Sequence, residues 1–159
     1  MRRAALAAAG AGATLAAAGL IAALAWPGGG AAGAVELRPD DTALVAMGAR
    51  VYDETCAACH GANLEGQPDW RARGPDGRLP APPHDETGHT WHHDDAALFR
   101  LTKEGLAAIL GEGSDYETDM PAYAGVLTDE EILAALSFIK SRWPAEVRAR
   151  HDALGPGAG

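Results

Sequence analysis

Two cysteines three positions apart, followed at once by a histidine, restrict this chain to a few kinds of fold. Cys56, Cys59 and His60 stand in the stretch ETCAACHGANLEG, and the chain has no other cysteine. A chain of 159 residues has room for one domain and a short appended segment. What the two thiols bond to therefore determines what else the core of that domain contains.

Three uses of such a cysteine pair fit this chain poorly. A disulfide that closes a four-residue loop removes little chain entropy and so stabilises little. A structural zinc site needs four ligands, and the sequence has no second cysteine pair to supply them. A thioredoxin-like redox pair belongs to a βαβ pattern, which we do not find here.

Covalent haem attachment is the fourth use, and it is the one that the motif favours. On a helical turn, Cys56 and Cys59 lie on one face, so both sulfurs can reach the two vinyl groups of one porphyrin edge. His60 then projects over the ring and offers a nitrogen to the iron. The order Cys-x-x-Cys-His is typical of this attachment, and one motif predicts one haem c per chain.

The expected secondary structure is helical, with long loops and no convincing strand. Apolar spacing, capping residues and Gly or Pro breaks predict helices over residues 43–54, 94–105, 128–143 and 145–154, with irregular loops over 61–90 and 111–123. The clearest signal is the capping box that begins at Thr128 and includes Glu131. An all-α domain of this size buries little apolar surface. A bulky cofactor would fill its core.

Met120 is the candidate for a second iron ligand. Haem iron bound by one histidine needs either a second ligand or an open face. Met47 falls inside the first expected helix, where packing explains it, whereas Met120 stands in the polar loop DMPAY shortly before the last helix. A thioether favours ferrous iron and so raises the reduction potential.

From Ala43 to Trp143 the chain resembles the class I cytochromes c. Helix, CxxCH, long loop, Met-Pro-x-aromatic and capped last helix occur in the family's order. The resemblance implies the class I cytochrome c fold, with three to four short helices and long loops around one haem c, and iron held by His60 and Met120. It also implies that the first and last helices cross where Gly48 and Tyr52 meet Phe138.

The resemblance also implies a backbone partner for His60. In the family, a loop proline offers its carbonyl oxygen to Nδ1–H of the haem-bound histidine. Pro82 is the counterpart that we favour here, with Pro80 and Pro83 as competitors. This chain departs from the family beside that site, because His84 replaces an apolar residue.

A histidine-rich stretch is a second departure from the family, containing His84, His89, Trp91, His92 and His93. One of these histidines could replace Met120 on the iron, or several could bind copper or zinc, although their spacing fits no defined site. We interpret them instead as hydrogen-bonding loop residues. Trp91 is expected to cover an edge of the haem or a propionate.

The first 34 residues read as an export segment. Arg2 and Arg3 precede an apolar run that contains no charge, and a Gly-rich stretch follows. Ala32-Gly33-Ala34 has the form that a signal peptidase cleaves, whereas the length of residues 4–26 suits an uncleaved membrane anchor. We expect residues 1–34 to be a signal peptide or an anchor with a linker, 35–145 to be the cytochrome c domain, and 146–159 to be a short, partly flexible helical tail.

The charge of the exported part excludes one class of partner and argues against another. Without Arg2 and Arg3, 11 basic residues face 22 acidic ones, a net charge of −11. Such a surface repels nucleic acid, which binds clustered Lys and Arg. Lys103 and Lys140 are the only lysines, so the lysine ring that many family members use to dock acidic partners is missing.

We therefore expect an exported electron carrier that exchanges single electrons with redox proteins and has no catalytic residue. A haem subunit of a larger oxidoreductase fits the same description. One alternative is a gas-binding or gas-sensing haem protein in which Met120 leaves the iron readily. Another is a haem enzyme such as a peroxidase, with His92 or His93 acting on the open face.

Overall fold

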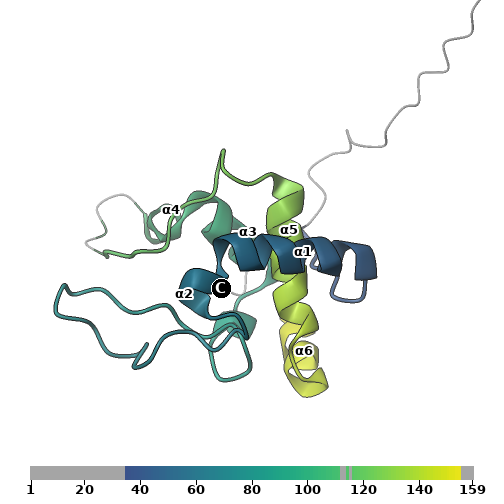
Figure 1. The fold of residues 1–159 in the computed structure, drawn as a ribbon, viewed down its shortest axis with the longest axis horizontal. Helices are drawn as coiled ribbons and strands as arrows, with labels where there is room; N and C mark the ends of the chain where they lie inside the picture. Colours follow the sequence, from purple (N-terminus) through teal and green to yellow (C-terminus); the bar gives the residue numbers. More distant parts are fainter. Residues whose placement is uncertain (1–34, 112–113, 115, 155–159) are drawn as a thin grey trace, which may run out of the picture. The chain divides into compact units, whose positions relative to one another are not determined.

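The described part of this computed structural model, residues 35–111, 114 and 116–154, is helical (Figure 1). Its elements are α1 (Thr42–Thr55), α2 (Ala57–His60), the 3₁₀ turn η1 (Thr90–His92), α3 (Asp95–Glu104), α4 (Leu106–Leu110), α5 (Asp129–Ser141) and α6 (Ala145–Asp152). Within those residues the only β-type pairing is an isolated bridge between Ala124 and Leu127. The predicted all-α fold class is confirmed, while the expected N-terminal apolar helix lies outside the described residues.

The two long helices begin at side-chain caps. Asp41 caps α1, where its carboxylate accepts a hydrogen bond from Leu44 N at 3.1 Å. Thr128 and Glu131 form the predicted capping box of α5, because each side chain accepts from the other residue's backbone amide. These bonds satisfy amides that a helix start leaves without a partner.

α1 and α5 cross in close contact (Figure 1), and Gly48 lies at the crossing. A Cβ atom on Gly48 would lie 1.9 Å from the backbone oxygen of Ala134 and 2.9 Å from Cβ of Phe138. One turn further along α1, the rings of Tyr52 and Phe138 pack with centroids 5.4 Å apart. The absence of a side chain at Gly48 therefore allows the two backbones to approach.

The core lies between these helices and extends toward the cysteine motif. Its buried members are Leu37, Tyr52, Leu64, Leu98, Ile132, Leu136, Ile139, Trp143 and Val147. Partly buried residues that pack against this core include Cys56, Trp91 and Tyr123. The motif and the loop residues are therefore fixed to the same apolar cluster as the helices.

The short helix α4 was not predicted from the sequence. Gly105 ends α3 with a positive φ of 85°, which redirects the chain before α4 begins. A Cβ on Gly105 would lie 3.2 Å from Cβ of Ala122, so this turn packs close to the loop that carries Met120. A five-residue helix has too little apolar periodicity to be recognised from sequence.

α6 packs through Val147 and His151, which are both buried. The His151 ring packs on Trp143, with centroids 5.0 Å apart. Beside it, the buried ammonium of Lys140 lies 3.6 Å from Asp95 Oδ1 and 2.6 Å from Asp152 Oδ1. A mixed apolar and ionic contact therefore joins α6 to α3 and α5.

No helix of the described residues combines the length and apolar character needed to cross a bilayer.

Gly48→Ala should destabilise the protein. In an exposed helix this change would stabilise by roughly 1 kcal/mol. Here the added methyl group meets the Ala134 backbone, so we expect a net loss of about 2 kcal/mol or more. Thermal unfolding of the full chain measures the change, and Ala46→Gly, at an exposed position of α1, controls for helix propensity. A Gly48→Ala protein as stable as the wild type would contradict the close helix crossing.

The His151 side chain should make stability depend on pH. Burial, then the charge of Lys140, lowers the pKa of His151 below its usual value of 6.5. The unfolded chain therefore binds a proton more readily, and stability is complete above about pH 6.5 and falls as the pH drops below it. In His151→Phe, the slope of unfolding free energy against pH should be smaller below pH 6.5. An unchanged slope would show that His151 binds protons equally in both states.

Candidate functional site

The cysteine motif forms one tight turn at the end of α1. Cys56 ends α1 and begins α2, and its carbonyl oxygen accepts from the backbone amides of Cys59 at 3.1 Å and His60 at 2.9 Å. Cys56 is partly buried and Cys59 is exposed, and both thiols are free. Burial raises the pKa of the Cys56 thiol. Two sulfurs and an imidazole are thus carried by a single turn.

His60 is buried and hydrogen-bonded through one ring nitrogen. Its Nδ1 lies 2.9 Å from the carbonyl oxygen of Pro82, and the side chain is 7% exposed. A carbonyl oxygen only accepts, so Nδ1 carries the proton and Nε2 keeps its lone pair. Burial lowers the pKa of His60 although the Pro82 bond opposes this shift. The imidazole is therefore neutral at neutral pH and can bind a metal through Nε2.

Gly66 brings Pro82 to this place. It adopts a positive φ of 68°, and a Cβ there would lie 2.5 Å from Pro83 N. Its amide donates to the His60 carbonyl at 2.7 Å, and the next amide, of Gln67, donates to Ala81 O at 2.9 Å. The two ends of the long loop thus meet beside the motif. The role of Gly66 cannot be predicted from the sequence, since a single glycine in a Gly-rich loop gives no distinguishing signal.

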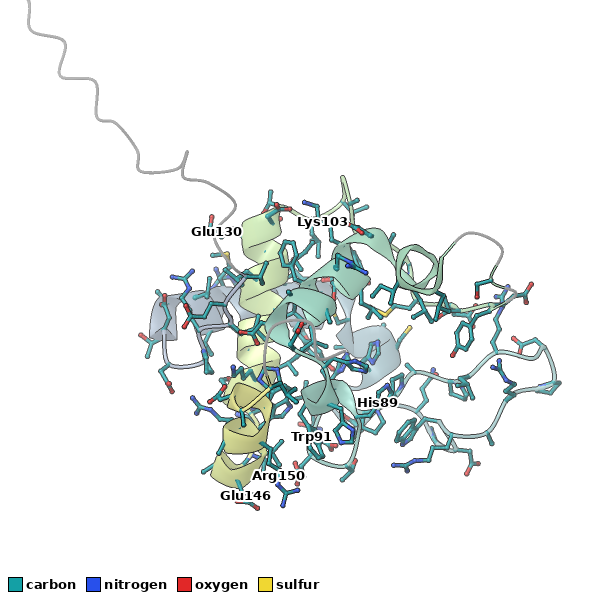
Figure 2. All side chains as sticks on the ribbon, turned by 180° about the vertical axis from the view of Figure 1, so that it is seen from behind. His89, Trp91, Lys103, Glu130, Glu146 and Arg150 are labelled. Atoms are coloured by element: carbon teal, nitrogen blue, oxygen red, sulfur yellow. The ribbon has the colours of Figure 1, made fainter. Side chains whose placement is uncertain are left out.

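The histidine-rich stretch separates into a part packed against His60 and a part around η1. His84 stacks on His60, with ring centroids 4.0 Å apart and planes 20° from parallel. His89 instead stacks on Trp70 at 5.4 Å, and it lies with Trp91 on the segment around η1 (Figure 2). Among the described residues, no group of three or more His, Cys, Asp or Glu side chains is arranged to hold a metal ion.

Trp91 packs against the apolar core, and its indole N–H forms a hydrogen bond with the backbone. Its indole Nε1 donates to Glu86 O at 3.3 Å. Its ring contacts His92 at a centroid distance of 3.8 Å, nearly edge-on. The indole N–H therefore stabilises the 86–91 turn, and the expected role of Trp91 at a haem edge stays a prediction.

Met120 lies partly buried in a loop that hydrogen bonds connect to the motif. Its amide donates to Thr118 Oγ1 at 3.1 Å. Three residues later, the Tyr123 hydroxyl donates to Thr55 O at 3.2 Å, directly before Cys56. The Tyr123 amide donates to Thr102 O at 3.1 Å, so α3 holds the same loop.

An ion pair joins the Met120 loop to the long loop that follows α2. The Arg78 guanidinium contacts Asp119, the neighbour of Met120, and lies 3.6 Å from Glu117 Oε2. These carboxylates raise the pKa of Arg78 further above its usual range. The sequence offered no signal for this contact, because its partners are 41 positions apart.

The donor set fits a covalently attached haem. Thiols, a neutral imidazole with a free Nε2 and a thioether are the groups that bind such a cofactor and its iron. Burial raises the pKa of the Tyr52 hydroxyl, which donates to Gly61 O at 2.8 Å, so the surroundings disfavour added charge. The arrangement suits a redox metal rather than acid–base chemistry.

Comparison with known proteins agrees with this assignment of a covalently attached haem. The family model Cytochrome c matches residues 45–143, which include α1 from Val45 onward and all of α2 to α5. The Cbb3-type cytochrome c oxidase subunit CcoP of Azospirillum sp. (strain B510) is 33% identical over 99 residues, covering 62% of this chain and 29% of that protein. The chain thus spans less than a third of the length of this relative.

No solved structure matches the chain significantly. The family match covers more than half of the chain and every residue of the candidate site. The chain therefore belongs to the cytochrome c family, whose domain binds haem c covalently and carries electrons.

Proposed function

We propose that this chain is an exported monohaem c-type cytochrome that carries single electrons between redox proteins. Cys56 and Cys59 attach the haem, and His60 and Met120 hold its iron. Pro82 orients His60, and Trp91 lies against the cofactor's edge. The same site with a labile Met120 would instead bind a gas, and the experiment below separates the two functions.

The hydrogen bond from His60 to Pro82 is the observation that carries this proposal. It fixes the tautomer in which Nε2 is free to bind iron, at a distance of 2.9 Å from Nδ1 to the carbonyl oxygen. His60, which makes this bond, lies on the same turn as the Cys56 and Cys59 thiols. A metal-bound histidine usually donates its second N–H in this way, which fixes the ring and increases its basicity.

The protein's contribution to electron transfer is to hold ligands and exclude water. Haem iron supplies a one-electron ferric–ferrous couple, whose potential depends on its axial ligands and on burial. Tyr52 and Leu64, both 2% exposed, line the apolar side of the motif. Tyr123 and Arg78 hold the Met120 loop, so the thioether stays available to the iron in both oxidation states.

Respiratory complexes are the partners that we propose. The relative described above is a subunit of a cbb3-type cytochrome c oxidase. We propose that this chain likewise passes electrons to such a complex or within it. Cys59 is the exposed thiol of the motif, and we place the approach of partners on its side. Contacts between electron-transfer partners are small and weak, which suits a surface without a lysine ring.

Export and attachment to the membrane belong to the same proposal. Residues 1–34 would direct export, ending in cleavage near Ala34 or in an anchor formed by residues 4–26. An anchor would hold the domain at 35–145 on the periplasmic side and raise its concentration near membrane partners. Residues 146–159 would form the short tail, which contains α6 apart from its first residue, Ala145.

A carbon monoxide titration of the ferrous holoprotein tests this function. The full chain is produced with the haem-attachment machinery, and a pyridine haemochrome spectrum checks for haem c. The wild-type spectrum should not change with carbon monoxide, because Met120 occupies the sixth position. Met120→Ala should bind carbon monoxide readily and have a lower reduction potential, since it loses the thioether.

Met47→Ala is the matched control, because Met47 is the other methionine of the described residues and lies in α1. It should leave both the spectrum and the potential unchanged. If the wild-type protein binds carbon monoxide readily, the gas-binding function takes the place of electron transfer. A wild-type protein without haem c would overturn the whole proposal.

Arg78→Gln should loosen the Met120 loop. The ion pairs of Arg78 with Asp119 and Glu117 are exposed, so their effect is small and screened by salt. At low salt, we expect imidazole to replace Met120 on ferric iron with roughly two- to fivefold higher affinity in the variant than in the wild type. At high salt, the two affinities should be equal. Arg100→Gln is the control, because its pair with Glu104 lies within α3. Equal imidazole affinity at low salt would exclude a role for Arg78.

A further inference from the structure

His84 is the one residue of the histidine-rich stretch whose ring contacts the His60 imidazole. The two rings lie nearly parallel, 20° apart, at a centroid distance of 4.0 Å. Nearly parallel rings at this short distance are stacked face to face. His60 thus has the Pro82 carbonyl at its Nδ1 edge and the His84 ring against one face.

His84 is held in place by contacts that do not involve His60. Its Nδ1 lies 2.7 Å from Thr90 Oγ1, and Thr90 is 6% exposed. Its amide donates to Leu64 O at 2.8 Å. Its carbonyl oxygen accepts from Trp143 Nε1 at 2.7 Å. Two of these hydrogen bonds therefore fix the His84 backbone to core residues, and the third fixes its ring to Thr90.

By itself, the bond to Pro82 does not restrain every motion of the His60 ring. A carbonyl oxygen accepts hydrogen bonds over a broad range of directions. An imidazole fixed only at Cβ and at Nδ1 can therefore rock about the line that joins those atoms. A planar ring held against its face opposes this rocking. An aliphatic side chain at position 84 would fill the volume but would present no flat surface.

We propose that His84 is a positioning residue that sets the plane of the axial His60 imidazole. The inference rests on the proposed function, in which His60 Nε2 binds the haem iron. The direction of the ring plane determines how the imidazole π orbitals overlap with the iron orbitals, and so the magnetic anisotropy of the ferric state. A fixed ring also reduces the movement of the ligand between the two oxidation states, which favours rapid electron transfer. Ligands that must keep one geometry depend on such supporting contacts.

Electron paramagnetic resonance of the ferric holoprotein at fixed pH tests the proposal. His84→Leu removes the flat face, and we expect its principal g-values to shift by more than the wild-type linewidth and its signals to broaden. His92→Leu makes the same change at an exposed histidine of the stretch, and its g-values should equal those of the wild type. A purely structural role of His84 would lower the melting temperature without moving the g-values.

Thr90→Val provides a second variant that keeps both imidazole rings and removes the hydroxyl that holds the His84 ring, together with the longer bond of 3.5 Å from that hydroxyl to Pro83 O. It should also shift or broaden the signals, and it decides the question if His84→Leu fails to retain haem. Wild-type g-values in a haem-loaded His84→Leu or Thr90→Val protein would overturn this proposal and leave the proposed function standing. A wild-type protein without haem c would overturn both, and the haemochrome spectrum distinguishes the two failures.

Discussion

The hydrogen bond between His60 and Pro82 is the contact on which the arrangement of the site depends. It links residues 22 positions apart, across a loop with no regular secondary structure. A loop of that length has a large conformational entropy to lose. Its ends are brought together by Gly66, which has no side chain to separate them. The backbone of the loop thus becomes a partner for the one imidazole of the motif.

The helices provide the frame that makes such a loop ordered. α1 and α5 approach closely at Gly48, and the core between them reaches Leu64 and Trp143. Trp143 then donates its indole N–H to His84 O at 2.7 Å, so the turn that follows α5 directly holds the loop. Packing of the helices, order in the loop and orientation of His60 are therefore coupled. A change at the helix crossing acts on the site through this chain of contacts.

α6, which lies outside the matched residues, adds a buried ionic contact to the apolar core. Lys140 is 5% exposed and lies between Asp95 and Asp152, with His151 packed beside them. Burying charges is costly unless they are paired, and these residues come from α3, α5 and α6. The family model ends at residue 143, so α6 lies beyond the matched residues while Lys140 and Asp95 lie within them. The cluster holds α6 against α3 and α5.

Local sequence signals predict most of the helices. Asp41 and the box of Thr128 and Glu131 are short-range patterns that depend on bonds within three positions of sequence. The helix crossing at Gly48 was predicted from the resemblance, and the structure shows it. α4 was missed because five residues carry too little periodicity. The capping box and the cysteine motif can be recognised from the sequence because their interacting residues lie close together in the chain.

By itself, the sequence determined the all-α class, the cysteine motif and the residue types that a haem protein needs. It singled out Pro82 and Met120 as candidates, but it could not show their surroundings. Only the tertiary structure placed the His84 ring on His60, Arg78 against Asp119 and the Trp91 indole on Glu86. The reason is physical: these contacts join groups whose spacing follows no helical or strand period, so they form only when the loops fold over the core.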